Sequence, residues 1–283
     1  MGSLSVEFTP ARIAVYRSGQ PAPMVVQNAR PDERVFVHPL LAPDGEGTLT
    51  ENEPPHHAWQ HGLYVGLNLV NGIGFWTEGK LPGHGPDGTF HPRPMRAPVV
   101  DENTAAWSVS SEWRDPAGNP LLDETQAWRY EDRGATGVLD LAWTLTARVD
   151  LQFGRHAYGG LFLRMPWRAE TGGDVLTSEG AATIADAEGR AARWVALAMP
   201  LPDRTTGPAG VAILDHPSNP VYPSPWRVDG NLGIAPSRCI AGAWSLAKGI
   251  VTTSRYRVLL YTGKINADLI NEVSREFAVG EQG

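Results

Sequence analysis

Short apolar runs that alternate with polar residues recur along the chain, and turns containing glycine or proline separate them. The alternation has a period of two, which places every second side chain on one face, as in a half-buried strand. No helical periodicity intervenes before the C-terminus, and 31 glycines and 24 prolines supply the turns. Many short strands at regular spacing predict an all-β sandwich or barrel. The runs are residues 5–8, 12–16, 24–28, 35–41, 63–69, 75–76, 105–113, 126–131, 138–149, 159–165, 182–185, 194–199, 211–215 and 254–261.

The chain departs from this pattern in two places. Residues 81–98 are rich in glycine, proline and histidine without periodicity, which predicts a long loop. At the C-terminus, Asn266 can cap a helix, and an amphipathic helix over about 266–278 is predicted to pack on the β body. The stripe that faces the β body consists of Ala267, Ile270, Val273, Ser274 and Phe277. No linker, repeat or low-complexity tract divides the chain, so we expect a single domain over residues 1–283.

Composition narrows the class of partner. Charged residues make up 19% of the chain and the formal net charge is -7, which argues against nucleic acid or an anionic membrane and favours a neutral or cationic small ligand. No apolar segment approaches the length that crosses a bilayer, and the N-terminus does not resemble a signal peptide. We therefore expect a soluble, cytoplasmic protein, and the single Cys239 fits a reducing compartment. Nothing in the sequence indicates an oligomeric state.

Three of the eight histidines lie in PPHHAWQHGLYVGLNLVNGIGFW, which spans residues 54–76. If this segment is extended, His57, Trp59 and His61 share one face, so that two imidazoles flank an aromatic platform. Histidine can donate and accept protons near neutral pH, and such a platform suits sugar hydroxyl groups. We predict His57 and His61 as catalytic residues. The predicted substrate-binding residues of this segment are His56, Trp59 and Trp76.

A metal site is the alternative for the same histidines. His57 and His61 are four residues apart, a spacing that on a helix would place both on one face as metal ligands. Prolines precede the cluster, a strand follows it, and no glutamate lies inside it, so this alternative is secondary. The candidate ligands are His38, His57, His61 and His216. We therefore predict no metal, with a divalent metal kept as the alternative. We also predict no organic cofactor, because a nucleophile elbow, a P-loop, a dinucleotide fingerprint and a CxxC pair are all missing.

The segment DHPSNP at residues 215–220 is a second candidate. It follows an apolar strand directly, and its prolines would hold polar side chains rigidly at the end of a sheet. We predict that His216 is catalytic and that Asp215 and Asn219 bind substrate, on a wall opposite the first histidine cluster. The alternative is a structural turn in which Asp215 and Asn219 bond to nearby backbone amides.

Further substrate-binding candidates are spread along the chain. Arg164 interrupts an apolar strand. If its guanidinium group is buried, it needs a carboxylate partner or an anionic or polyhydroxyl ligand. The alternative is an arginine that faces solvent from a half-exposed strand. Tyr158 is a weaker candidate of the same kind. Glu124 is a candidate carboxylate or an exposed residue at a strand end. Trp226 is a stacking platform or, by the simpler interpretation, a core residue. His38 lies within the predicted strand at residues 35–41.

Several segments together resemble the bacterial PmoA-like family, often labelled "methane oxygenase PmoA". They are VFVHPLLAPDG (35–45), HHAWQHGLYVGLNLVNGIGFW (56–76), YGGLFLRMPW (158–167) and AILDHPSNPVYPSPWRV (212–228), with a weaker match in RYRVLLYTG (255–263). The label does not fit, because a membrane oxygenase subunit needs several membrane-spanning helices. The resemblance implies a soluble, large antiparallel β-sandwich similar to the galactose-mutarotase-like supersandwich, in bacteria whose related genes look like sugar-catabolism genes.

The resemblance leaves the histidine roles open. In the family's usual form a histidine pair immediately precedes Gly-Leu, whereas here Gln60 precedes His61, so each role can fall to His56, His57 or His61.

Together these observations predict a carbohydrate-active enzyme with histidine-centred acid/base chemistry on a sugar or glycoside. The expected reactions are epimerisation or mutarotation, and elimination or hydration of an oxidised sugar. The alternatives are a non-catalytic carbohydrate-binding or regulatory protein on the same scaffold, and a metal-dependent enzyme with histidine ligands.

Overall fold

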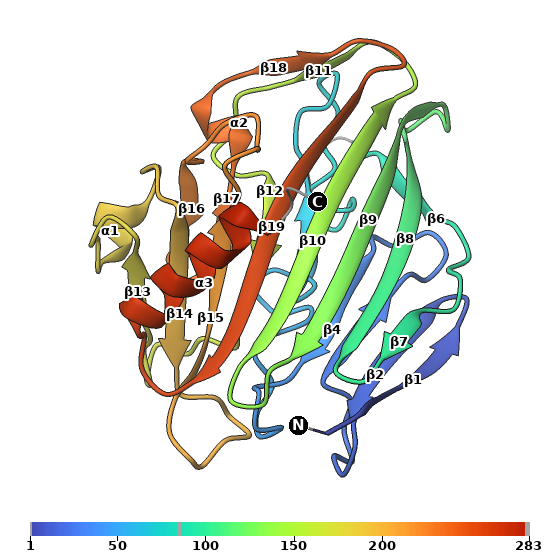
Figure 1. Ribbon diagram of the computed structural model, residues 1–283. Coiled ribbons are helices and arrows are strands. Elements are labelled where there is room, and N and C mark those ends of the chain that lie inside the picture. Colours follow the sequence, from blue (N-terminus) through green and yellow to red (C-terminus); the bar gives the residue numbers. More distant parts are fainter. Residues whose placement is uncertain (1, 84–85, 281–283) are drawn as a thin grey trace.

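Two large antiparallel sheets face each other in the computed structural model, which describes residues 2–83 and 86–280 (Figure 1). Within these residues the first sheet has eight strands. In spatial order they are β1 (Leu4–Thr9), β2 (Arg12–Arg17), β3 (Val25–Asn28), β4 (Phe36–Leu40), β5 (Leu63–Gly66), β12 (Gly160–Leu163), β17 (Ile234–Pro236) and β16 (Trp226–Val228).

The second sheet has nine strands among the described residues. In spatial order they are β13 (Asp174–Thr177), β14 (Trp194–Met199), β15 (Ala209–Asp215), β19 (Val251–Thr262), β10 (Gly137–Ala147), β9 (Pro120–Asp132), β8 (Thr104–Arg114) and β6 (Thr89–Pro92), with β7 (Val99–Asp101) also paired to β8. A small ribbon of β11 (Leu151–Phe153) and β18 (Trp244–Leu246) lies at one end (Figure 1).

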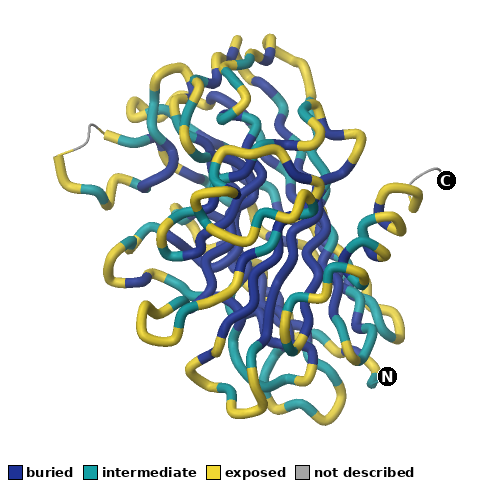
Figure 2. Tube along the Cα trace, turned by 90° about the vertical axis from the view of Figure 1, so that its left-hand side faces the viewer, coloured by how far each residue is buried: buried dark blue, intermediate teal, exposed yellow. Residues whose placement is uncertain are grey.

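The main core lies between the two sheets. Alternate residues of the long strands are buried there, for example Leu139, Leu141 and Trp143 of β10, and they belong to the same core cluster as Leu63 and Val65 of β5 from the first sheet. Figure 2 shows the buried strands in the middle of the molecule and the exposed loops around them. This arrangement is that of two packed sheets whose inner faces supply the core.

Helix α3 (Ala267–Val279) covers part of the outer face of the second sheet (Figure 1). The side chain of Asn266 accepts a hydrogen bond from the Leu269 amide, which is the predicted cap. Ile270, Val273 and Phe277 are the buried residues of the helix, and they pack on a cluster of outward-facing strand residues. The fold-class prediction, an all-β antiparallel sandwich with one C-terminal helix, is thus confirmed. The single-domain prediction stays a prediction.

Three local predictions are wrong. Residues 182–185 do not form a strand, because Thr183 accepts a hydrogen bond from the Asp186 amide and caps the one-turn helix α1 (Ile184–Ala187). Phe75 and Trp76 lie outside the strands, in the segment that follows β5. The predicted loop over 81–98 contains β6, while its residues 84–85 are outside the described part. None of the described helices is both long and apolar enough to cross a membrane.

Candidate functional site

An aromatic cluster lies on the outer face of the eight-stranded sheet, away from the main core. Phe36, Tyr64 and Phe162 come from the adjacent strands β4, β5 and β12, where Tyr64 is directly paired with both of the others. Period-two geometry turns these residues outward while Leu63 and Leu163 turn inward. Trp76 packs on this cluster, and Trp59 and Tyr158 are partly buried against it.

One end of the cluster holds a buried ion pair with a histidine attached. Oε1 of Glu78 lies 3.2 Å from Nε of Arg34 and 3.1 Å from Nε2 of His61. Nδ1 of His61 lies 2.9 Å from Oδ1 of Asn52, and its ring stacks on Phe36 at 4.8 Å. Both ring nitrogens of His61 are therefore engaged by protein oxygen atoms, which fixes the orientation of the imidazole. The other carboxylate oxygen of Glu78, Oε2, lies 3.8 Å from Nζ of Lys80, which is beyond hydrogen-bonding distance.

The backbone around Glu78 is also unusual. Its φ of 53° lies in the left-handed region, which a glutamate rarely adopts. The neighbouring backbone is held by Arg34, whose Nη2 donates to the carbonyl oxygens of Phe75 at 2.6 Å and Trp76 at 2.7 Å. Such conformations persist where the surrounding structure enforces them, and they concentrate at functional sites.

A second buried ion pair lies beside the first. Nη2 of Arg164 donates to Oδ2 of Asp229 at 2.6 Å, and Nε donates to Oε1 of Gln60 at 2.7 Å. Nη1 donates to the carbonyl oxygen of Asn231 at 2.7 Å. The side chain of Arg164 is 1% exposed, as is that of Arg34. Asp229 is thus the carboxylate partner that was expected if Arg164 is buried.

Several buried polar atoms around these ion pairs form no hydrogen bond with the described residues. Some belong to the charged groups themselves, namely Arg34, His61 and Glu78. The others include Nδ1 of His57, Nε1 of Trp59 and the hydroxyl group of Tyr64. A buried polar group without a hydrogen bond costs about 1–3 kcal/mol, so such groups require a ligand or solvent to satisfy them. The rings of His57 and Trp59 pack edge to face with their centroids 5.1 Å apart, and both residues remain partly exposed. These two side chains can therefore contact a bound molecule.

The environment sets the protonation of these groups. Burial alone would raise the pKa of Glu78, but Arg34, His61 and Lys80 outweigh it and hold the pKa below its usual range. The pKa of Asp229 is lowered in the same way, since Arg164 outweighs burial. Burial, with Arg164 and His56 nearby, lowers the pKa of His57, and Asp229 opposes this shift. At neutral pH the site therefore contains two carboxylates and a neutral His57.

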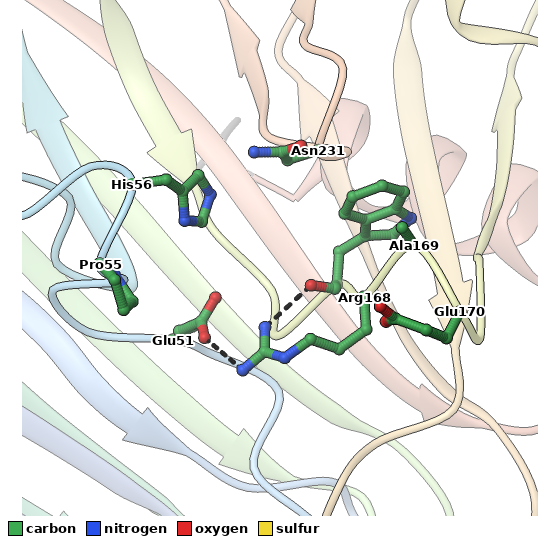
Figure 3. A pocket seen from close by; sticks show the side chains of 8 residues that line it. Glu51, Pro55, His56, Arg168, Ala169, Glu170 and Asn231 are labelled. Carbon is green, nitrogen blue, oxygen red and sulfur yellow. Dashed lines mark hydrogen bonds and ion pairs between the residues drawn. The ribbon is translucent and has the colours of Figure 1, made fainter.

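Two pockets adjoin this centre. The first has a volume of about 520 Å³ and is lined by Glu51, His56, Trp167, Arg168 and Asn231 among others (Figure 3). Figure 3 shows Arg168 joined to Glu51, with Nη2 and Oε1 2.7 Å apart. The second pocket, of about 550 Å³, is lined by Asn68, Asp87, His156 and Tyr158 among others.

Most residues of the first predicted cluster meet on this face. His57, Trp59, His61, Trp76, Tyr158 and Arg164 all belong to the centre, and His56 lines the first pocket. His38 turns outward from β4, where Nδ1 lies 2.9 Å from Oγ1 of Thr50. Burial and the nearby His61 lower the pKa of His38, against the opposing effect of Glu51.

The segment at residues 215–220 is not brought to this face. The ring of His216 packs against Phe277 of α3 at 4.8 Å, on the outer side of the other sheet. Asp215 accepts from the Ser224 amide at 2.7 Å, and Asn219 bonds to the backbone of Arg255. The segment is thus the structural turn that we kept as the alternative. Its placement does not support a wall opposite the histidine cluster, nor site roles for its three residues.

Two more candidates lie in the interior. The Glu124 carboxylate accepts hydrogen bonds from the indole nitrogens of Trp113 at 2.9 Å and Trp143 at 2.8 Å. It is buried, not at an exposed strand end, and burial raises its pKa. Trp226 is a core residue whose indole donates to the carbonyl of Ala192 at 2.8 Å. Neither placement supports a substrate-binding role.

Several central residues are absent from the predictions. Arg34, Asn52, Glu78 and Asp229 reach the site from loops, and no local pattern marks them. The sequence offered one indication of them, which was that a buried Arg164 would need a carboxylate partner.

Among the described residues no group of three or more His, Cys, Asp or Glu side chains is arranged to hold a metal ion. The divalent-metal alternative stays a prediction without a ligand set in that part of the chain.

Comparisons with known proteins place the chain in a family. A sequence model described as "Family of unknown function (DUF6807)" matches residues 5–275. A comparison with curated proteins found no match. The resemblance to a PmoA-like family stays a prediction, because the description of the matching family names no activity.

Two solved structures illustrate the structural likenesses. One is the GH36 alpha-galactosidase AgaB from Geobacillus stearothermophilus, with 10% identity and a TM-score of 0.44, over 91% of this chain and 41% of that one. The other is a galactose mutarotase related enzyme from Lactobacillus acidophilus, with 9% identity and a TM-score of 0.38, over 92% of this chain and 97% of that one. This chain thus spans less than half the length of the alpha-galactosidase. At such values the likenesses concern the arrangement of strands, and we draw no functional argument from them.

Proposed function

The chain belongs to the DUF6807 family, and we propose that it binds a sugar or glycoside on the outer face of its eight-stranded sheet and transfers protons to and from it. One observation carries this proposal. Two fully buried arginines each hold a carboxylate beside an aromatic cluster, and His57 and Trp59 border them with buried polar atoms that form no hydrogen bond within residues 2–83 and 86–280. Pockets that combine aromatic walls with a few fixed polar groups are typical of small-molecule sites.

The chemistry of these groups suits a carbohydrate. The indole face of Trp59 can stack on the C–H face of a sugar ring while its N–H donates to a hydroxyl group. The carboxylates of Glu78 and Asp229 can accept hydrogen bonds from further hydroxyl groups. The net charge of -7 also favours a neutral ligand over a polyanion.

Glu78 and His57 are the two groups that we assign to proton transfer. Glu78 is ionised and can take the proton of an anomeric hydroxyl group, while the fraction of His57 that is protonated, a minority at neutral pH because its pKa is lowered, gives its proton to the ring oxygen. The bond between the anomeric carbon and the ring oxygen then breaks and a carbonyl forms. Ring closure returns both protons, so the cycle needs no further reactant. The same base can remove a carbon-bound proton beside a carbonyl, as elimination from an oxidised sugar requires.

We propose a role for His61 that differs from the predicted catalytic one. Because both of its ring nitrogens face protein oxygens, it orients Glu78 and does not itself reach the ligand. His57 is partly exposed and is the histidine of the cluster that can exchange a proton with a bound sugar.

The test is an NMR assay in deuterated water with D-glucose, D-galactose, D-glucuronate and D-galacturonate. We expect accelerated exchange between anomers, or deuterium on carbon, with at least one of them. His57→Gln should lower that rate about 100-fold or more. His91→Gln is the matched control, because His91 lies in β6 of the other sheet beside Thr89 and Asp32. Sugar binding by calorimetry without any exchange would instead support a non-catalytic carbohydrate-binding protein.

A further inference from the structure

The second pocket lies at the far end of β5 and β12 from the ion pair of Arg164 and Asp229. Asn68 follows β5, and His156 and Tyr158 precede β12, whereas Arg164 follows β12 at the opposite end. The two strands are antiparallel, with Gly66 paired to Gly160 and Leu63 paired to Leu163. The pocket and the Arg164–Asp229 ion pair therefore sit at opposite ends of the same strand pair.

The polar groups of this pocket are held in place. The Asp87 carboxylate accepts from Oγ1 of Thr77 at 2.5 Å and from the Gly79 amide at 3.1 Å. Nδ2 of Asn68 and Nε2 of His156 are 3.3 Å apart. A fixed carboxylate, an amide and an imidazole thus converge on one pocket of about 550 Å³.

A glycine is needed for this convergence. A β-carbon added to Gly74 would lie 2.5 Å from Oδ1 of Asp87 and 3.1 Å from Oδ1 of Asn68. The first distance is too short for any real contact, so a larger residue would push Asp87 away. The close approach of these two acceptors therefore depends on the missing side chain at this position.

An aromatic wall connects the pocket to the centre. Tyr158 lines the pocket, its ring lies 4.2 Å from that of His156, and it packs on Trp76 at 4.6 Å. Thr77 lines the pocket and immediately precedes Glu78. Along β5 the separation from Leu63 to Gly66 is three steps of about 3.3 Å, or about 10 Å. Two linked sugar rings can cover this span, and one ring cannot.

We propose that this pocket is a second sugar subsite, so that the ligand is a disaccharide or a glycoside with a sugar-sized substituent. This inference rests on the proposed function. One ring lies beside His57 and Glu78, and the second unit stacks on Tyr158 and bonds to Asp87, Asn68 and His156. The mixture of an aromatic wall, the apolar Leu69, Ile73 and Leu81, and fixed polar groups is what a sugar ring requires.

Calorimetric titration tests the subsite. The probes are D-glucose and D-galactose against cellobiose, maltose, lactose and melibiose. We expect at least one disaccharide to bind tenfold or more tightly than its component monosaccharides. His156→Ala should reduce that affinity to the level of the monosaccharide and leave monosaccharide binding unchanged. Arg155→Ala is the matched control, because Arg155 is the exposed neighbour of His156 and does not line the pocket.

The outcomes separate the two proposals. If disaccharides and monosaccharides bind equally and His156→Ala changes neither, the subsite is refuted and the proposed function stands. If no sugar binds the wild-type protein, both proposals are refuted. Should His156→Ala fail to fold, Asn68→Ala replaces it, because it removes one polar group of the pocket and leaves the imidazole in place. A loss of disaccharide binding alone in that variant supports the subsite.

Discussion

Replacing Glu78 by glutamine should separate the two roles of this residue. The carboxylate neutralises Arg34, and their side chains are only 10% and 1% exposed. Removing one partner of a buried ion pair costs about 3–5 kcal/mol. Glutamine keeps an acceptor oxygen toward Arg34 and His61, so we expect the lower end, about 3 kcal/mol. The total stability of a domain is about 5–15 kcal/mol, and the variant should fold with a melting temperature lower by about 6–12 °C.

The pH dependence gives this cost a signature. Arg34 and His61 hold the folded pKa of Glu78 below its ordinary value of 4.5. The stabilisation by the carboxylate is therefore fully present above pH 4.5 and is lost as the pH falls through the folded pKa. The difference in unfolding free energy between wild type and Glu78→Gln should shrink in that acid range. Chemical denaturation followed by circular dichroism at several pH values measures it.

Activity gives the second readout of the same variant. Loss of the proton acceptor should lower turnover in the NMR assay about 100-fold or more while the protein stays folded. Glu179→Gln is the matched control, because Glu179 is 58% exposed, follows β13 of the other sheet and lies 3.6 Å from Arg193. We expect that control to change stability by less than about 0.5 kcal/mol. Turnover of folded Glu78→Gln within twofold of wild type would refute the assignment of Glu78.

Three further predictions concern pH and the turn after β15. The pH profile of kcat/KM should be bell-shaped. Its alkaline limb should have a midpoint below pH 6.5, because His57 must be protonated to donate and burial beside Arg164 lowers its pKa. Full activity at pH 8 would contradict this assignment. Burial raises the pKa of Asp215 from 3.8 to about 6, so the stability that this group contributes is present below pH 3.8 and is lost as the pH rises through about 6. The loss is on the order of 3 kcal/mol, and denaturation from pH 4 to 7 should show a slope that Asp215→Asn lacks. His216→Ala should lower the melting temperature through lost packing on Phe277 but leave turnover unchanged, and a 100-fold loss of turnover would restore its predicted catalytic role.

The sequence is most informative where structure is local. The alternation of apolar residues identifies the long strands, and Asn266 marks the start of α3, because burial on one face and capping leave patterns within a few residues. The same local argument failed at residues 182–185, where the side chain of Thr183 bonds to the Asp186 amide and outweighs strand propensity.

The site was harder to predict because its partners are distant in sequence. Asp229 is 65 residues from Arg164, and Glu78 returns to His61 through a loop with a left-handed backbone. Alternation along β15 alone cannot reveal that His216 turns toward α3, since it does not specify what covers that face. Histidine spacing pointed to the segment that contributes His57 and His61 to the candidate site, but the carboxylates beside it come from tertiary structure.

The central claim is that a sugar binds over His57 and Glu78 on the outer face of the eight-stranded sheet. The most direct measurement is an NMR titration of the ring resonances of the eight histidines with the sugars and disaccharides named above. We predict that the resonances of His57 and His61 shift with ligand and that those of His216 do not. Shifts confined to His216, or no shift at any histidine at saturating ligand, would contradict the proposed site.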